Sequence, residues 1–275
     1  MSELFEFDFL RNAFLAGILA SIVCGVLGTF VVVRRLVFIS GGISHAAFGG
    51  LGVCYFFGWP PLLGAFLVAG LTAAVLGGEA DDKPRGHDAI IGVLWALGMA
   101  LGIIFIYKTP GYAPNLMSYL FGDILTVTGT DLALMGALTV VVLVVTGALY
   151  KELVAVSFDA TFARIQNVPV RGLQTVLLLL VGAAIVVLIQ VVGIVLVMAL
   201  LTVPTMTAMM IVDRFGAVVV TSAVVSLAMV IVGLLVSYFY DVPSGPTVVV
   251  CGVMMMGAAW AVQRWRRQSA RRGAR

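Results

Sequence analysis

"VLLLLVGAAIVVLIQVVGIVLVMALL", residues 176–201, contains no charged side chain. A helix needs about 20 mostly apolar residues to cross the hydrocarbon core of a bilayer. The apolar run continues on both sides of this stretch, and its length is sufficient for two crossings, which we predict at 172–191 and 193–211. The stretch therefore predicts helices that have lipid rather than water as their solvent.

The composition of the whole chain supports the same fold class. Of its 275 residues 62% are hydrophobic and 11% are charged, whereas soluble proteins average about 25% charged residues. Further apolar runs lie at 11–33, 36–57, 60–78, 89–107, 131–150, 217–240 and 246–263. We predict an all-α, polytopic membrane protein of about eight or nine transmembrane helices. The spans occupy one transmembrane domain, 1–263, and leave no length for a soluble catalytic domain, so the chain is not expected to be an enzyme itself.

Charge at the C-terminus predicts the orientation. Residues 264–275 form a basic tail, because the end of the chain holds six arginines and no acidic residue. Basic segments stay on the cytoplasmic side of a membrane. With nine spans, this places the tail and the loop 151–171 inside, and the N-terminus and the loop 240–246 outside. The segment 115–127 is too short and too polar to span, and is predicted to be re-entrant.

An imidazole interrupts one of the apolar runs. In "RRLVFISGGISHAAFGG", residues 34–50, His45 lies ten residues into the predicted helix, at a depth of about 15 Å and near the middle of the bilayer. Gly41, Gly49 and Gly52 share its helical face, within an arc of roughly 80°. Intramembrane ionisable residues usually mark ion or substrate paths, but a histidine can also form a hydrogen bond to a neighbouring helix while glycines serve packing. The residues alone leave both interpretations open.

The loop 151–171 contains a short amphipathic helix. Three apolar residues have i, i+4, i+7 spacing on one face: Phe158, Phe162 and Ile165. Asp159 in its first turn and Arg164 near its end suit the helix dipole, and Asn167 can take the left-handed conformation that closes a helix. Such a helix could dock into a groove on a soluble partner or lie on the lipid surface.

Six segments carry a resemblance to a known family. In chain order they are "RRLVFISGGISHAAFGG", "DAIIGVLWALGMALGI", "NLMSYLFGDILTVT", "AVSFDATFARIQNV", "VVGIVLVMALLTVPTMTA" and "YDVPSGPTVVV". Together they resemble the membrane permease subunits of ABC importers for zinc, manganese and iron, most closely the zinc-uptake (ZnuB-type) permeases. The resemblance covers roughly residues 11–252.

The resemblance implies an assembly and a cargo. The assembly is a permease homodimer in the bacterial inner membrane, with a pair of cytoplasmic ATP-binding subunits that hydrolyse ATP and an extracytoplasmic metal-binding protein. The cargo is a divalent transition metal ion, zinc before manganese or iron, and no permanently bound cofactor or nucleic-acid partner is expected.

The resemblance also implies roles for particular residues. His45 becomes a transient metal ligand in a pathway lined by Gly41, Gly49 and Gly52. The segment around Phe162 becomes the coupling helix that docks on the ATPase, with these residues: Phe158, Asp159, Phe162, Ala163, Arg164 and Asn167. Ala163 matches the family motif, while Asn167 replaces its glycine.

One departure concerns the metal site. The family usually has an aspartate four residues before the histidine, and here that position is Gly41. A carboxylate there would share the face of the imidazole and help to hold a divalent ion. Its loss implies a weaker site, another ligand or another cargo.

Two other classes of function fit the sequence less well. An ion-coupled secondary metal transporter without an ATPase would need several intramembrane carboxylates, and the predicted spans contain none. A membrane-embedded enzyme would need more than one lone histidine at depth. The chain also lacks a phosphate-binding loop motif, so an ATP-driven mechanism requires a partner.

Overall fold

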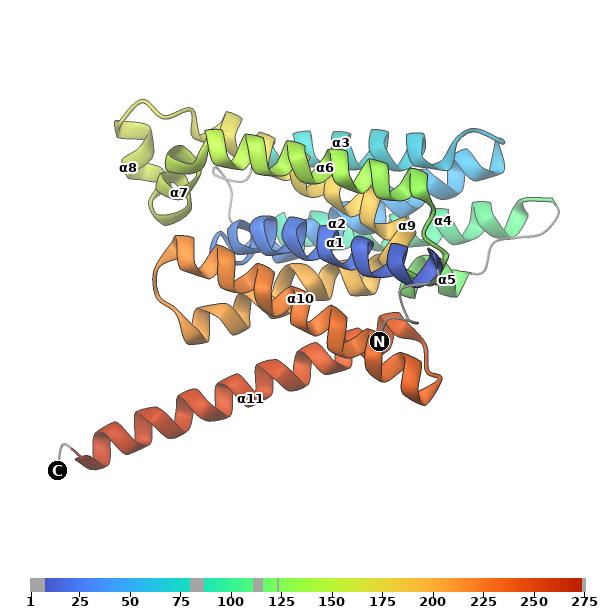
Figure 1. Cartoon of the computed structure of the whole chain (residues 1–275). Helices are drawn as coiled ribbons and strands as arrows, with labels where there is room; N and C mark the ends of the chain where they lie inside the picture. Colours follow the sequence, from blue (N-terminus) through green and yellow to red (C-terminus); the bar gives the residue numbers. More distant parts are fainter. Residues whose placement is uncertain (1–7, 80–86, 111–115, 123, 274–275) are drawn as a thin grey trace.

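The computed structural model describes residues 8–79, 87–110, 116–122 and 124–273, and the described part is a bundle of long helices (Figure 1). The long elements are α1 (Asp8–Val33), α2 (Val37–Phe56), α3 (Pro61–Glu79), α4 (His87–Lys108), α6 (Gly129–Ala148), α9 (Val170–Ile211), α10 (Phe215–Tyr240) and α11 (Ser244–Gly273). The described residues contain no strand. The predicted fold class, a polytopic helical membrane protein, is confirmed.

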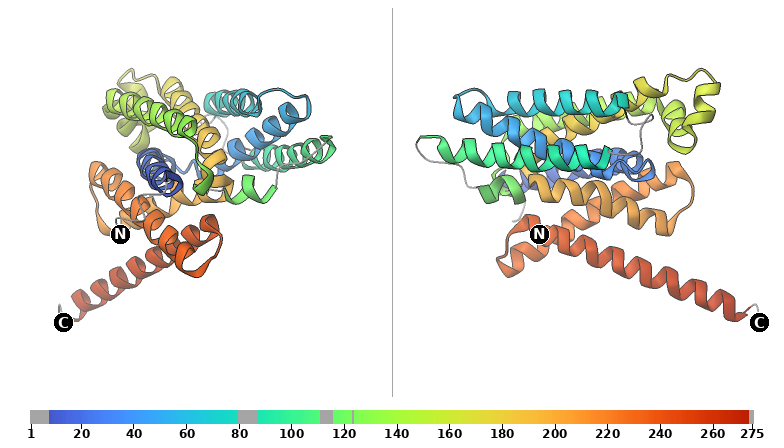
Figure 2. Two further views of the ribbon diagram at one scale, coloured as in Figure 1. Left: turned by 45° about the vertical axis from the view of Figure 1, so that its right-hand side comes forward. Right: turned by 180° about the vertical axis from the view of Figure 1, so that it is seen from behind.

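Helix α9 folds back on itself at Gly193. This residue has φ 77° and ψ 161°, a backbone conformation that only glycine adopts at low cost. The two legs on either side of it run in opposite directions (Figures 1 and 2). The continuous apolar run therefore makes two crossings, at the position where the sequence predicted a boundary between 172–191 and 193–211.

The number of apolar helices agrees with the prediction. Seven described helices are long and apolar enough to cross a membrane. One of these seven is α9, which contributes two legs, and the shorter apolar helix Pro61–Gly77 lies beside them. When the two legs of α9 are counted separately, the described residues form nine apolar helical segments.

The segments between α4 and α6 are short, as predicted for a re-entrant piece. Helix α5 (Leu116–Phe121) and the 3-10 turn η2 (Ile124–Thr126) are too short to span a bilayer. They lie at the end of the bundle where the chain begins, opposite α7 and α8 (Figure 1). Gly122, with φ 74°, packs directly against the reversal at Gly193.

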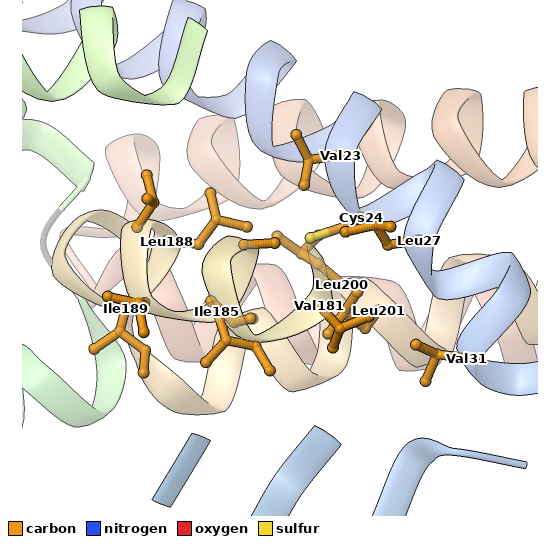
Figure 3. Close-up of a cluster of buried hydrophobic side chains, with 14 of the residues drawn as sticks. Val23, Cys24, Leu27, Val31, Val181, Ile185, Leu188, Ile189, Leu200 and Leu201 are labelled. Carbon is orange, nitrogen blue, oxygen red and sulfur yellow. The ribbon is translucent and has the colours of Figure 1, made fainter. Parts of the chain in front are cut away.

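The core of the bundle is the contact between α1 and the two legs of α9. Figure 3 shows Val23, Cys24 and Leu27 of α1 facing both legs. All of these side chains are almost completely buried. Close helix contact is possible here because Gly28 of α1 meets the backbone carbonyl of Leu201. This packed centre fixes the helices that surround it, including α2.

Helix α11 continues past its predicted span. The apolar run was predicted to end at 263, but the helix extends without a break to Gly273 and leaves the side of the bundle (Figure 1). Near this point Gln263 donates a hydrogen bond to the carbonyl of Met210, at 3.2 Å. The guanidinium of Arg264 lies 5.3 Å from the ring centre of Trp260, a cation–π contact. The basic tail therefore begins as helix.

Candidate functional site

His45 lies in the middle of α2, eight residues after the helix begins at Val37. Its imidazole stacks on the indole of Trp95 in α4, with ring centres 4.5 Å apart and an interplanar angle of 19°. The side chain is half-buried. Its Nδ1 atom is buried and has no hydrogen-bond partner among the residues that the structure describes. The hydrogen bond to a neighbouring helix, one of the two interpretations that the sequence left open, is therefore not made by Nδ1 within the described residues.

The three glycines that share the histidine face of α2 all pack against α4. A Cβ atom on Gly49 would lie 2.9 Å from the carbonyl oxygen of Gly98, and one on Gly52 would lie 2.6 Å from that of Gly102. Gly98 in turn meets the carbonyl oxygen of His45 itself. Glycine at these positions lets the two helix backbones touch. The predicted glycine face thus exists as a helix contact, and its place along a pathway stays a prediction.

Gly41 is the third member of this face and contacts side chains rather than backbone. A Cβ atom there would lie 2.9 Å from Cζ3 of Trp95 and 3.4 Å from Cε of Met198, which belongs to the second leg of α9. The hydroxyl of Ser44 donates to the carbonyl of Ser40 at 2.8 Å and lies 3.6 Å from the sulfur of Met198. The position of the family aspartate is therefore closed by an indole and a thioether.

The carboxylates of the described residues lie outside the middle of the spans. Every described acidic residue lies at or near a helix end or in a connection: Asp8, Glu79, Asp88, Asp131, Glu152, Asp159, Asp213 and Asp241. Within the described ranges no group of three or more His, Cys, Asp or Glu residues could hold a metal ion. The imidazole of His45 is the basic side chain that lies in the middle of a described span.

An apolar cavity of about 290 Å³ lies beside the histidine, between α2, α3 and α4. Its walls include Ala46, Gly49, Gly50, Gly64 and Gly98. Small residues leave this space because they remove side-chain volume between closely packed helices. The cavity offers almost no polar surface, and His45 is not among the residues that line it.

The predicted coupling helix is two helices. Helix α7 (Tyr150–Phe158) ends at Phe158, and α8 (Ala160–Ile165) begins after Asp159. Asp159 has extended backbone angles, and its carboxylate accepts a hydrogen bond from the backbone N–H of Phe162 at 2.9 Å. The prediction that Asp159 belongs to the first turn of one helix was wrong, because aspartate stabilises a helix N-terminus from the capping position outside it.

The end of α8 agrees with the prediction. Asn167 has φ 60°, the left-handed conformation expected of it. The N–H of Asn167 donates to the carbonyl of Arg164, and the N–H of Val168 donates to that of Ala163, both at 3.0 Å. These two bonds close the helix, so replacement of the family glycine by asparagine preserves the turn.

The apolar side chains of this region separate into a buried and an exposed set. Ala163 is 1% exposed, whereas Phe162 is 57% and Ile165 is 72% exposed. Phe158 is also exposed, but it belongs to α7 and its ring contacts that of Phe215 in α10, with centres 5.8 Å apart. Helix α8 therefore packs against the rest of the described chain through Ala163, and Phe162 and Ile165 remain uncovered.

Sequence reasoning missed Trp95 and Met198. A signal for Trp95 was present, since tryptophan favours membrane interfaces and this one lies eight residues into an apolar helix. The chain's other tryptophans, Trp59, Trp260 and Trp265, lie close to the ends of helices or among basic residues. Nothing in the sequence distinguishes Met198 from a core methionine.

The described residues form a multi-span membrane protein with a short helix of exposed apolar side chains at one end of the bundle and an imidazole in the middle of a span. The chain belongs to the ABC 3 transport family, whose model matches residues 6–263. It is 31% identical over 258 residues to the manganese transport system membrane protein MntC of Halalkalibacterium halodurans, which covers 94% of this chain and 88% of that protein.

Two further likenesses support the assignment. The membrane protein slr2045 of Synechocystis is 39% identical over 249 residues, covering 90% of this chain and 89% of that protein. A chain of PsaBC from Streptococcus pneumoniae, solved in complex with a Fab, superposes with a TM-score of 0.86 at 26% identity and 98% coverage of both chains. The protein is thus a permease of the metal-ion ABC transporter type, and the closer resemblance to the zinc-uptake branch stays a prediction.

Proposed function

We propose that the protein is the membrane subunit of a binding-protein-dependent ABC importer that moves a divalent transition metal ion, zinc first, into the cytoplasm. The observation that carries the proposal is the imidazole of His45, which is half-buried at mid-depth and has an Nδ1 atom without a hydrogen-bond partner in the described chain. An unsatisfied polar atom is costly where no water can reach it. A passing metal ion would satisfy it, since neutral imidazole is a common metal ligand.

A homodimer would complete the site. A two-fold axis relates the same surface of both subunits, so it could bring both copies of His45 to one pathway and provide two nitrogen ligands. Two imidazoles without a carboxylate bind an ion weakly. Weak binding suits a pathway, because the ion must leave the site as readily as it enters.

Helix α8 would couple ATP hydrolysis in the partner subunit to transport. Its uncovered residues Phe162 and Ile165 provide apolar anchors for a groove on a cytoplasmic ATP-binding subunit, as in other helix-in-groove contacts. The basic C-terminal helix and α8 lie at the same end of the bundle (Figure 1), and the positive-inside rule favours the cytoplasm for that end. The opposite end would receive the metal-binding protein.

The test is metal uptake in cells that lack their own zinc and manganese importers, with the ATP-binding subunit and the metal-binding protein co-expressed. We expect His45→Ala to abolish or sharply slow uptake of zinc at unchanged expression. His87→Ala changes the chain's other histidine, at the start of α4, and is expected to leave uptake unchanged. Uptake by His45→Ala at the unaltered rate would make the histidine a packing residue and remove the proposed pathway.

A further inference from the structure

The space next to His45 that a side chain at position 41 would fill is taken by Trp95. Gly41 is buried, and a Cβ atom on it would lie 2.9 Å from Cζ3 and 3.2 Å from Cη2 of that indole. Real Cβ atoms essentially never come within 3.0 Å of another heavy atom, and the contact with Cη2 would also be tighter than nine in ten real Cβ contacts. Gly41 and Trp95 are therefore complementary in size, because the indole fits against α2 where residue 41 has no side chain.

The same indole sets the position of the imidazole. The two rings lie nearly parallel with centres 4.5 Å apart, and Phe38 packs on the indole at 5.7 Å. Stacked aromatic rings hold each other in a preferred geometry. Trp95 of α4 thus sets the orientation of the imidazole plane. The indole itself has no carboxylate with which to bind a metal ion.

We propose that Trp95 is a specificity-determining residue of the transport pathway: it excludes a carboxylate from position 41, which disfavours manganese relative to zinc. The inference rests on the proposed function, because it assumes that the ion passes His45. It concerns which ion is preferred, and it assigns Trp95 a positioning role rather than that of a ligand.

The donor chemistry supports this direction of preference. Manganese(II) binds most weakly in the Irving–Williams order and is suited to carboxylate, carbonyl and water oxygens, whereas imidazole suits zinc. The donors around the indole are the imidazole of His45, the thioether of Met198 and the hydroxyl of Ser44, and that hydroxyl already donates to a backbone carbonyl. No carboxylate of the described residues lies in a span near them.

The experiment is competitive uptake of zinc and manganese by the full transporter, with four variants. We expect Gly41→Asp alone to reduce uptake of both ions, because the new side chain overlaps the indole. Gly41→Asp combined with Trp95→Ala provides both the carboxylate and the space for it, and should raise the manganese-to-zinc uptake ratio by about tenfold. Trp95→Leu should lower zinc uptake, and Trp95→Phe, which keeps an aromatic ring on the imidazole, should retain zinc preference.

Three outcomes separate the possibilities. A residue that served only packing would change the amount of folded protein but not the ratio of the two ions, so an unchanged ratio in the double variant overturns the role of Trp95. A single Gly41→Asp variant that behaves like the double variant overturns it as well. If His45→Ala transports both ions normally, the pathway itself is wrong and both proposals fall. Trp95→Phe keeps an aromatic ring on the imidazole, so its uptake ratio can still be measured if Trp95→Leu fails to fold.

Discussion

The α2–α4 contact around His45 and the α7–α8 segment are both built from apolar residues, but they use them in opposite ways. Along α2, glycines bring two helix backbones together and bury them, and the partner of every glycine on the histidine face belongs to the same chain. On α8, one small residue is buried while Phe162 and Ile165 are exposed. The comparison indicates that the chain itself packs the α2–α4 contact, whereas its described residues leave Phe162 and Ile165 uncovered.

The largest expected effect is loss of the α2–α4 contact. In Gly52→Leu the first side-chain atom would fall 2.6 Å from the carbonyl oxygen of Gly102, so the helices would have to separate. Overpacking of this kind costs about 1–3 kcal/mol or more. We expect a large drop in the thermal unfolding temperature of the detergent-solubilised protein.

A matched control exists on the neighbouring helix. Gly92 of α4 has no atom within 4 Å of the position where its Cβ would lie, so Gly92→Leu should unfold near the temperature of the unaltered protein. Equal stability losses in both variants would show that the glycine contact is not what holds α2 against α4.

The second prediction moves to the exposed region. Phe162→Asp should leave folding unchanged, because the ring is 57% exposed, but should weaken binding of the ATP-binding subunit, since truncating an apolar anchor often costs about 2 kcal/mol or more at an interface. The measurements are co-purification of the two subunits and transport-stimulated ATP hydrolysis.

Thr161→Asp places the same charge on an exposed neighbour outside the apolar pair and should be tolerated better. If Phe162→Asp forms the complex and hydrolyses ATP like the unaltered protein, α8 is not part of the interface. The exposed side chains of α8 would then not differ from the buried α2–α4 contact by binding a partner.

The two regions also differ in how far the sequence predicted them. The span positions and the glycine face follow from composition and helical periodicity, which act locally, and the structure agrees with them. The depth of His45 in a bilayer stays a prediction. The stacking of Trp95 on His45 depends on which helices become neighbours and in what register. That information is distributed over all the helix contacts, so the partner of the imidazole was not predictable from α2 alone.

In the coupling segment the sequence predicted the end of the helix correctly and its beginning wrongly. Asn167 marks a left-handed closure because few residues tolerate that conformation. Asp159 is acceptable both in a first helical turn and as a cap, so its position left the start of the helix undefined by one residue. That single residue also moved Phe158 from α8 to α7.

The smallest expected effect concerns this cap. In Asp159→Ala the backbone N–H of Phe162 loses its acceptor at 2.9 Å, and such a loss typically costs about 1 kcal/mol. Because α8 has six residues, that amount should fray the whole helix while the bundle stays folded. Hydrogen exchange of the segment 160–165 should become roughly fivefold faster, with ATP coupling reduced less than in Phe162→Asp. Asp159→Asn keeps a capping oxygen and should exchange almost as slowly as the unaltered protein. If Asp159→Ala exchanges no faster, the packing of Ala163 is sufficient to hold α8 in place. Helix α8 would then be as rigid as the buried α2–α4 contact.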